Sequence, residues 1–448
     1  MEGKMTEGRP MPLLVKFAVP LLLGNLLQQT YNMMDAAIVG RILGANALAS
    51  VGLSTSVQFL VLGFCIGMCS GYSVLVAKNF GAGDLKQMRS CVFHGAVLSA
   101  GVAAILTTAC ALLCPAILHL MAAPEELFHN AWIYLLIIFL GIPFTILYNY
   151  LAGILRAIGN SRVPFIFLAI STVLNIGLDL FCIAVLKWGC AGAALATIMS
   201  QAISGALCLV YIIRKEKILI PGSGERMFRK KDAAAMLSMG IPMGLQLSIT
   251  AIGSMVMQAS NNGLGSVYVS GFTAGTRIKQ FAMCPFDALG TAVSVFCSQN
   301  YGAGKPDRIR KGLIDGYCLG ISYSIIAGLV LVFFGRTLSM LFVGADETAI
   351  LDASARYLGA LGPLYWALAI VAIGRLAVQG LGHPGLAVTA GIIEMFARTM
   401  VCLILVPKFG YTVICWADQS AWLTADIFLV PAIIVIYRRI RAKYVTET

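Results

Sequence analysis

A twelve-residue segment occurs twice in this chain, and its spacing limits the folds open to the protein. Asn79-Phe-Gly-Ala-Gly-Asp-Leu-Lys-Gln-Met-Arg-Ser90 returns as Asn300-Tyr-Gly-Ala-Gly-Lys-Pro-Asp-Arg-Ile-Arg-Lys311. The two copies lie 221 residues apart in a chain of 448 residues. Pro20 and Pro242 extend the correspondence, as do Leu155–Gly159 and Val378–Gly382. We therefore expect two copies of one structural unit.

The composition places both copies in a membrane. Hydrophobic residues make up 59% of the chain, charged residues only 12%, and the mean hydropathy is +0.86, whereas a soluble domain carries about 25% charge. Apolar runs of about 20 residues, long enough to cross a bilayer as helix, recur along the whole length. We expect about twelve such helices: Leu13–Gly40, Ala47–Val76, Val92–Leu118, Trp132–Ile154, Pro164–Leu186, Ala191–Ile213, Met236–Met257, Val267–Ser298, Ile314–Phe334, Tyr357–Val378, Leu386–Val406 and Ile414–Ile436.

The predicted fold is an all-α membrane protein with two six-helix lobes. Residues 1–213 form the N-terminal lobe, 214–231 a polar cytoplasmic linker and 232–448 the C-terminal lobe. Because six helices per copy is an even number, both copies enter the membrane from the same side. Such a repeat predicts a pseudo-twofold axis along the membrane normal, an arrangement typical of transporters that rock two bundles against each other.

The net charge of +12 has a topological explanation that does not involve nucleic acid. Counted along alternating loops, most Lys and Arg residues fall on one side of the membrane. The other side has only Arg41, Lys187, Arg336, Arg356 and Lys408. This asymmetry predicts a multi-pass inner-membrane protein with both termini in the cytoplasm, and no nucleic-acid partner.

Several kinds of energy source and chemistry are excluded by what the motifs lack. The Gly-Ala-Gly loops are too short for a phosphate cradle and no Gly-Lys-Ser/Thr follows them, so we interpret them as tight helix–helix turns. The thirteen Cys residues are an odd number without Cys-x-x-Cys and read as small apolar residues. A membrane enzyme would require His, Asp or Cys constellations that we do not find. Transport driven by an ion gradient, without a cofactor, is the remaining expectation.

The strongest candidate for ion coupling is Asp35 in the first predicted helix. Gln28, Tyr31, Asn32 and Asp35 fall at i, i+3, i+4 and i+7, so one face of this helix is polar over two turns. Pro20, about four turns earlier, removes a backbone hydrogen bond and permits a helix bend.

Two further helices offer oxygen groups at a similar depth. Asp179 follows Asn175 by one turn in the fifth predicted helix, and Thr197 lies in the sixth. At about 1.5 Å per residue, Asp35, Asp179 and Thr197 lie roughly 8–10 Å below the same membrane surface. These groups either join the helices or form a cation or proton site. Two carboxylates in one dry bundle repel each other unless a cation or proton lies between them, which favours the site.

The second half contains charges of its own. Glu394 and Arg398 are at i and i+4 on one predicted helix, and we expect them to pair with each other. Arg277 and Asp287 share the eighth predicted helix, where they either line a cleft or balance charge.

Taken together, these motifs resemble the multidrug and toxic compound extrusion (MATE) family. The resemblance rests on Pro20…Gln28-x-x-Tyr31-Asn-x-x-Asp35, on both Asn-Phe/Tyr-Gly-Ala-Gly loops and on Asn175-Ile-x-Leu-Asp179 followed by Thr197. It covers essentially the whole chain. It implies two six-helix lobes, efflux of bulky, often cationic compounds in exchange for H⁺ or Na⁺, and an N-lobe cation site at Asp35, Asn175, Asp179 and Thr197. The seventh predicted helix, Met236–Met257, lacks the acidic residue of other family members.

These observations predict a cation-coupled multidrug antiporter that works as a monomer by alternating access, with drugs or toxins and membrane lipids as its partners. The side chains expected to contact substrate are Gln28, Tyr31, Asn32, Asn149 and Gln246. The alternative is a flippase for lipid-linked cell-envelope precursors. It predicts more cationic residues along the cleft and helices beyond the twelfth. A channel fits two rocking halves less well.

Overall fold

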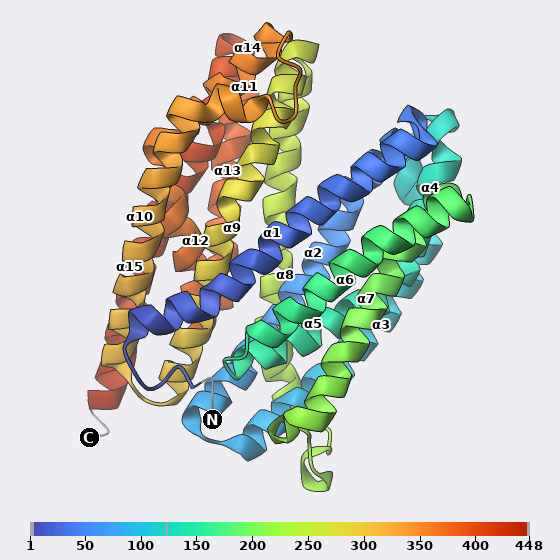
Figure 1. The fold of residues 1–448 in the computed structure, drawn as a ribbon. Helices are drawn as coiled ribbons and strands as arrows, with labels where there is room; N and C mark the ends of the chain where they lie inside the picture. Colours follow the sequence, from blue (N-terminus) through green and yellow to red (C-terminus); the bar gives the residue numbers. More distant parts are fainter. Residues whose placement is uncertain (1–3, 122–123, 446–448) are drawn as a thin grey trace. The chain divides into compact units, whose positions relative to one another are not determined.

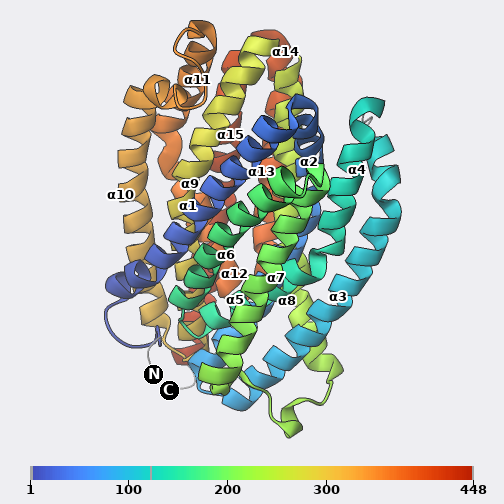
Figure 2. The same ribbon diagram turned by 45° about the vertical axis from the view of Figure 1, so that its right-hand side comes forward.

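A computed structural model describes residues 4–121 and 124–445, and every secondary-structure element in these ranges is helical (Figures 1 and 2). Eleven helices in the described ranges are long and apolar enough to cross a membrane, and a bent helix pair provides a twelfth span. Each span contains one of the twelve expected apolar runs, which confirms the all-helical membrane fold. The α-helices are α1 (Pro10–Leu43), α2 (Ala45–Ala82), α3 (Leu85–Leu120), α4 (Glu125–Leu140), α5 (Ile142–Ala157), α6 (Arg162–Leu180), α7 (Gly189–Lys215), α8 (Lys230–Asn262), α9 (Ser266–Gly302), α10 (Pro306–Ser339), α11 (Thr348–Leu361), α12 (Tyr365–Gly380), α13 (Pro384–Met400), α14 (Val406–Phe409) and α15 (Tyr411–Val445).

Short helices of other types connect these elements. Two π-helices, η1 (Phe181–Val185) and η5 (Val401–Leu405), follow α6 and α13 directly. Three 3₁₀ turns are η2 (Lys217–Leu219), η3 (Ser223–Glu225) and η4 (Gly362–Leu364). Because the π-helices end corresponding helices of the two copies, the sequence repeat extends to local backbone geometry.

The fourth predicted span, Trp132–Ile154, is not one helix and needs correction. It is divided between α4 and α5, which meet at an angle of 44°. Gly141 lies at the break, where a Cβ atom would approach the Ile198 side chain to 2.3 Å. Only glycine fits this close helix contact, and hydropathy alone does not reveal such a break.

Both Gly-Ala-Gly segments are tight turns between helices, as predicted. The third residue of each, Gly83 and Gly304, has a positive φ of 75° and 66° respectively. In each turn the following amide donates back to the asparagine carbonyl that opens the motif, Asn79 or Asn300. The left-handed residue lets the chain reverse at once, which explains the glycine at this place.

The chain divides into two compact units. The first unit contains Leu23–Ser248, and the second contains Met5–Leu22 with the chain from Ile249 onward. The divisions therefore fall inside α1 and α8, a few residues after Pro20 and Pro242. The lobe boundaries expected from the sequence, 1–213 and 232–448 with a linker at 214–231, stay a prediction.

Polar contacts fix the chain where it enters these two divided helices. In the second unit, Met5 N donates to Gln299 Oε1 (2.9 Å) and Arg308 Nη1 donates to the Gly8 carbonyl (2.7 Å). In the first unit, Arg89 donates to both carboxylate oxygens of Glu225 in the linker (2.7 and 2.8 Å). The segment preceding each divided helix is thus held by side chains of the unit that contains the start of that helix.

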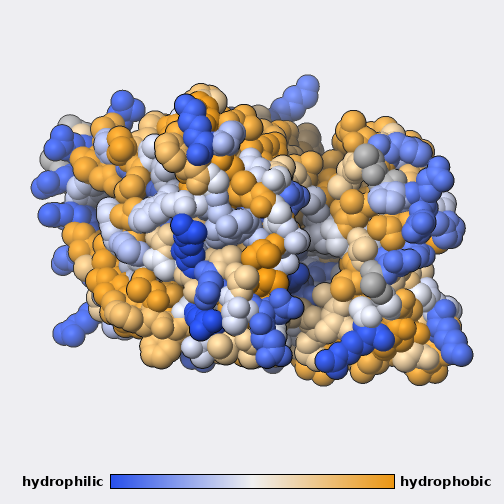
Figure 3. All heavy atoms as spheres, turned by 90° about the horizontal axis from the view of Figure 1, so that it is seen from above, coloured by the Kyte–Doolittle hydropathy of each residue, from blue (hydrophilic) through white to orange (hydrophobic). Residues whose placement is uncertain are grey.

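Large apolar side chains cover much of the outer surface, as the space-filling view shows (Figure 3). Examples from three helices are Leu112, Phe333 and Ile427, which are about three-quarters exposed. Such a surface is expected of helices whose outer faces contact lipid.

Candidate cation site

Three helices of the first unit bring the predicted coupling residues together. Asp35 lies on α1, Asn175 and Asp179 on α6, and Thr197 on α7. The Asp179 side chain is fully buried and Asn175 is 1% exposed. The carboxyl groups of Asp35 and Asp179 interact directly with each other, although they are 144 residues apart in the sequence.

Asn175 connects two of the other groups. With its amide oriented to satisfy hydrogen bonding, its nitrogen donates to Asp179 Oδ2 (3.0 Å) and its oxygen accepts from the Thr197 backbone N–H (3.2 Å). The amide thus ties α6 to α7 while holding one oxygen of the buried carboxyl group. The four residues form one cluster, and their role in cation binding stays a prediction.

Tyr31 also belongs to this cluster. Its hydroxyl oxygen lies 3.0 Å from Thr197 Oγ1, and Thr197 Oγ1 donates to the Ala193 carbonyl (3.1 Å). Because that donation uses the threonine proton, the Tyr31 hydroxyl is the donor between the two side chains. The residue expected to contact substrate is therefore also part of the candidate cation site.

Two members of the cluster were not among the sequence candidates. Tyr134 on α4 is almost completely buried and lies within electrostatic range of Asp35, Asp179 and Tyr31. Gln58 on α2 interacts with the Tyr134 hydroxyl. An isolated Gln inside an apolar helix was a weak signal for this position. A single Tyr in such a helix gives none, because buried aromatic side chains are common.

The cluster has unused acceptor capacity. Asp35 Oδ1 and Asp179 Oδ1 are both buried without a protein hydrogen-bond partner among the described residues. A buried carboxylate oxygen in this position is costly unless a proton or cation compensates it. The surrounding groups are all oxygen donors or hydroxyls, which suits a hard monovalent cation or a shared proton.

The remaining first-unit candidates lie in different environments. Gln28 and Asn32 are exposed on α1, while Gln246 on α8 is buried. Asn149 Nδ2 donates to the Thr145 carbonyl of its own helix (2.8 Å). Pro20 lies inside the continuous helix α1. Their predicted roles in substrate contact and helix bending are untested by this arrangement.

The second unit contains a buried network of charges. Arg398 donates to Glu394 Oε1 (2.9 Å), which confirms the predicted pairing along α13. The sequence did not predict that Arg398 also contacts Asp418 Oδ1 on α15 (3.0 Å) or that Lys279 on α9 contacts Asp418 Oδ2 (2.6 Å). Arg375 on α12 pairs with the second oxygen of Glu394. Five charged side chains from four helices thus neutralise one another.

Arg277 and Asp287, the other candidates of this half, are exposed on α9. Asp287 lies within electrostatic range of Arg375, so it faces the edge of the buried network. Both roles, lining a cleft and balancing charge, stay open for this pair.

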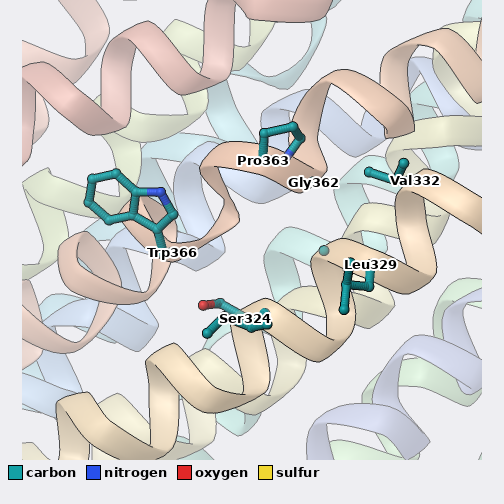
Figure 4. A pocket seen from close by; sticks show the side chains of 8 residues that line it. Ser324, Leu329, Val332, Gly362, Pro363 and Trp366 are labelled. Atoms are coloured by element: carbon teal, nitrogen blue, oxygen red, sulfur yellow. The ribbon is translucent and has the colours of Figure 1, made fainter.

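An apolar hollow in the second unit is separate from both clusters. It has a volume of about 250 Å³ and lies between α10 and η4 (Figure 4). Gly328 and Gly362 form its narrowest part, and Ile325 and Leu329 on its wall are more than half exposed. The hydroxyl of Ser324, its one polar side chain, donates to its own helix (2.7 Å). The hollow therefore offers apolar contact without a directing polar group.

Twelve spans in two related halves, with a buried polar cluster in each, define a membrane transporter. The sequence profile of the MatE family matches residues 20–181 and 242–404. The chain belongs to this family, and the two matched segments, which start 222 residues apart, are the two copies of the repeat. Family membership makes the chain a multi-pass membrane transporter rather than an enzyme.

Individual relatives agree with this assignment. The chain is 34% identical over 342 residues to the probable multidrug resistance protein YpnP of Bacillus subtilis, covering 76% of each chain. It is 28% identical to the probable multidrug resistance protein YoeA of the same organism over 339 residues, 74% of this chain and 73% of the relative. A crystal structure of MATE in complex with MaL6 matches the whole of both chains with a TM-score of 0.91 at 19% identity, which shows the same fold.

Proposed function

We propose that this transporter exports bulky, often cationic organic compounds in exchange for H⁺ or Na⁺. The observation that carries the proposal is the pair of interacting carboxyl groups, Asp35 and Asp179, each with a buried oxygen that no protein group satisfies. The names of the relatives, probable multidrug resistance proteins, support the substrate class.

The position of Asp35 on α1 suggests how a cation is coupled to transport. Tyr31 and Asp35 lie one turn apart on the helix that also contains Pro20. A cation or proton that joins Asp35 to Asp179 draws this part of α1 toward α6 and α7. The proline lacks a backbone N–H and permits the helix to bend in response. In this scheme drug leaves as the cation binds from outside, and the inward-facing form releases the cation to the cytoplasm.

Energetics limit the possible stoichiometry. The membrane potential is worth about 2.3 kcal/mol per charge per 100 mV, which sustains a gradient of about 40-fold. A monovalent drug cation exchanged for one H⁺ moves no net charge and gains nothing from this potential. Such a drug requires a pH difference or more than one coupling ion.

The proposed orientation places both termini and the basic loops in the cytoplasm. We propose that one chain suffices for transport, because all groups of the candidate cation site come from a single unit of one chain. Oligomeric state in detergent and labelling of the termini in sealed vesicles test these two points.

Transport by reconstituted protein tests the function directly. Ethidium efflux from vesicles is measured with an imposed Na⁺ gradient, an imposed pH gradient or a voltage, one at a time. We expect one ion gradient to drive efflux and Asp35→Asn and Asp179→Asn to abolish it at unchanged protein content. Asp307→Asn, an exposed carboxylate at the start of α10, is the matched control. Full efflux by Asp35→Asn under every gradient would remove the coupling assignment.

A further inference from the structure

The burial pattern fixes how the two copies of the repeat align, residue by residue. Buried positions of α7 recur in α15 at a constant spacing of 221 residues. Those of α6 recur in α13 at a spacing of 219, and the π-helices η1 and η5 follow at the same end of each. Pro20 and Pro242 set the spacing of α1 and α8 at 222.

This alignment assigns a counterpart in the second unit to every member of the candidate cation site. The pairs are Tyr31 and Gly253, Asp35 and Met257, Gln58 and Lys279, Tyr134 and Tyr357, Asn175 and Glu394, Asp179 and Arg398, and Thr197 and Asp418. Five of the counterparts meet in the buried charge network described above or adjoin it. The network is therefore the second copy of the same site.

The two copies differ in how their charge is balanced. The first-unit cluster contains two carboxyl groups, Asp35 and Asp179, and no basic side chain. The second-unit cluster also contains two carboxyl groups, Glu394 and Asp418, but it adds Lys279 and Arg398 in contact with them. One copy lacks a counter-charge, and the other carries its own.

The backbone makes room for Arg398. Its guanidinium group bridges Glu394 and Asp418, and all three side chains are at most 6% exposed. Gly253, the counterpart of Tyr31, faces this group, since a Cβ atom there would lie 2.9 Å from Arg398 Nη1. The place of an aromatic side chain in the first unit is thus given to a guanidinium in the second.

Lys279 completes the second copy from the other side. Its ammonium group contacts Asp418 at 2.6 Å and lies 5.7 Å from the centre of the Tyr357 ring. The Tyr357 hydroxyl donates to the same carboxylate oxygen (2.8 Å). Tyr134 and Gln58 occupy the corresponding positions in the first unit, where the neutral amide of Gln58 replaces the ammonium group.

We infer that the second unit contains a permanently filled copy of the cation site, in which Arg398 and Lys279 are covalently attached cations at the place of an exchangeable one. This copy holds α9, α11, α13 and α15 together and exchanges no ion. Ion exchange is then confined to the first unit. That last step rests on the proposed function of Asp35 and Asp179, whereas the charge arrangement does not.

Removal of a tethered cation should create a site for a free one. Full-length protein with Arg398→Ala is purified, and its thermal unfolding midpoint is measured with increasing low-millimolar guanidinium at constant ionic strength. We expect the midpoint to fall in the variant and guanidinium to restore at least half of the loss in a saturable manner. Wild type should show no such rise. Recovery no greater than in wild type would overturn the inference.

Lys279→Ala is the independent second case, tested with methylammonium in the same assay. If neither alanine variant accumulates, membrane accumulation of Arg398→Lys is compared with that of Arg398→Gln. The inference requires the charged replacement to accumulate several-fold better than the neutral one. Equal accumulation of the two contradicts a charge-based role.

These readouts measure stability and not transport. Failure of Asp35→Asn to affect efflux together with successful guanidinium recovery removes the coupling assignment and leaves the filled site. The reverse outcome removes the filled site and leaves the coupling assignment.

Discussion

The hydroxyl oxygens of Tyr31 and Thr197 lie 3.0 Å apart, and this contact joins α1 to α7 within the first unit. The two residues are 166 positions apart in the chain, and the sequence suggested different roles for them. Their contact means that a change at the candidate cation site reaches the polar face of α1 directly.

Removal of either hydroxyl should weaken transport. A buried hydrogen bond contributes about 1 kcal/mol, so Tyr31→Phe and Thr197→Ala should each lower the ethidium efflux rate by roughly five- to tenfold if the bond forms in only one transport state. Thr197→Ser keeps the hydroxyl and should retain most activity. Efflux by Thr197→Ala equal to that of wild type would show that the contact is incidental.

Tyr134 should affect ion dependence more than folding. It lies near both carboxyl groups of the site, and its hydroxyl is a candidate donor to them or ligand for a cation. We expect Tyr134→Phe to raise the coupling-ion concentration needed for half-maximal efflux by several-fold, with little change in the unfolding midpoint. Tyr148→Phe, whose hydroxyl donates to the Pro164 carbonyl (3.4 Å), serves as control. A parallel loss in both variants would argue for a general packing effect.

Gly253 should tolerate no side chain. Gly253→Ala places a methyl group 2.9 Å from Arg398 Nη1, and overpacking of this kind costs about 1–3 kcal/mol. Gly359→Ala on α11 is the matched control, because nothing lies within 4 Å of its Cβ position and alanine favours helix by about 1 kcal/mol over glycine. The two unfolding midpoints should therefore move in opposite directions. Equal midpoints would indicate that Arg398 adapts without strain.

The linker should loosen in acid. Hydrogen bonds from the Arg89 guanidinium lower the pKa of the Glu225 carboxyl from its usual 4.5. The folded state therefore favours the ionised form, and this stabilisation is present above the ordinary pKa and lost as the pH falls through the lowered one. Hydrogen-exchange protection of the Gly222 amide, which donates to Glu225 (2.8 Å), should be high at neutral pH and lost near about pH 3. Glu225→Gln should abolish most of that pH dependence. Equal protection of the wild-type amide at both pH values would mean that the ion pair does not hold the linker.

Sequence patterns predicted the elements well where the signal is local. Apolar runs located all twelve spans, and the glycines of the Gly-Ala-Gly motifs indicated two turns that the structure confirms. The break at Gly141 was missed, because it depends on how closely Ile198 of α7 approaches. Hydropathy reports what a helix contacts on average, not where a neighbour requires a glycine.

The candidate site was predicted in part for a similar reason. Asp35 and Asp179 stand out in any sequence because charged residues are costly in a membrane, and the structure shows them in contact. Tyr134 does not stand out. The Glu394–Arg398 pair was predictable from its spacing, but its extension to Asp418 joins helices whose packing no local pattern encodes.

The sequence by itself determined that this protein is a repeated, twelve-span membrane protein, because hydropathy and repeat spacing are properties of the chain read in order. Only the tertiary structure decided which polar groups meet. Contacts such as that of Lys279 with Asp418, 139 residues apart, depend on the packing of helices that a sequence leaves unspecified. The charge balance that distinguishes the two copies of the site follows from that packing.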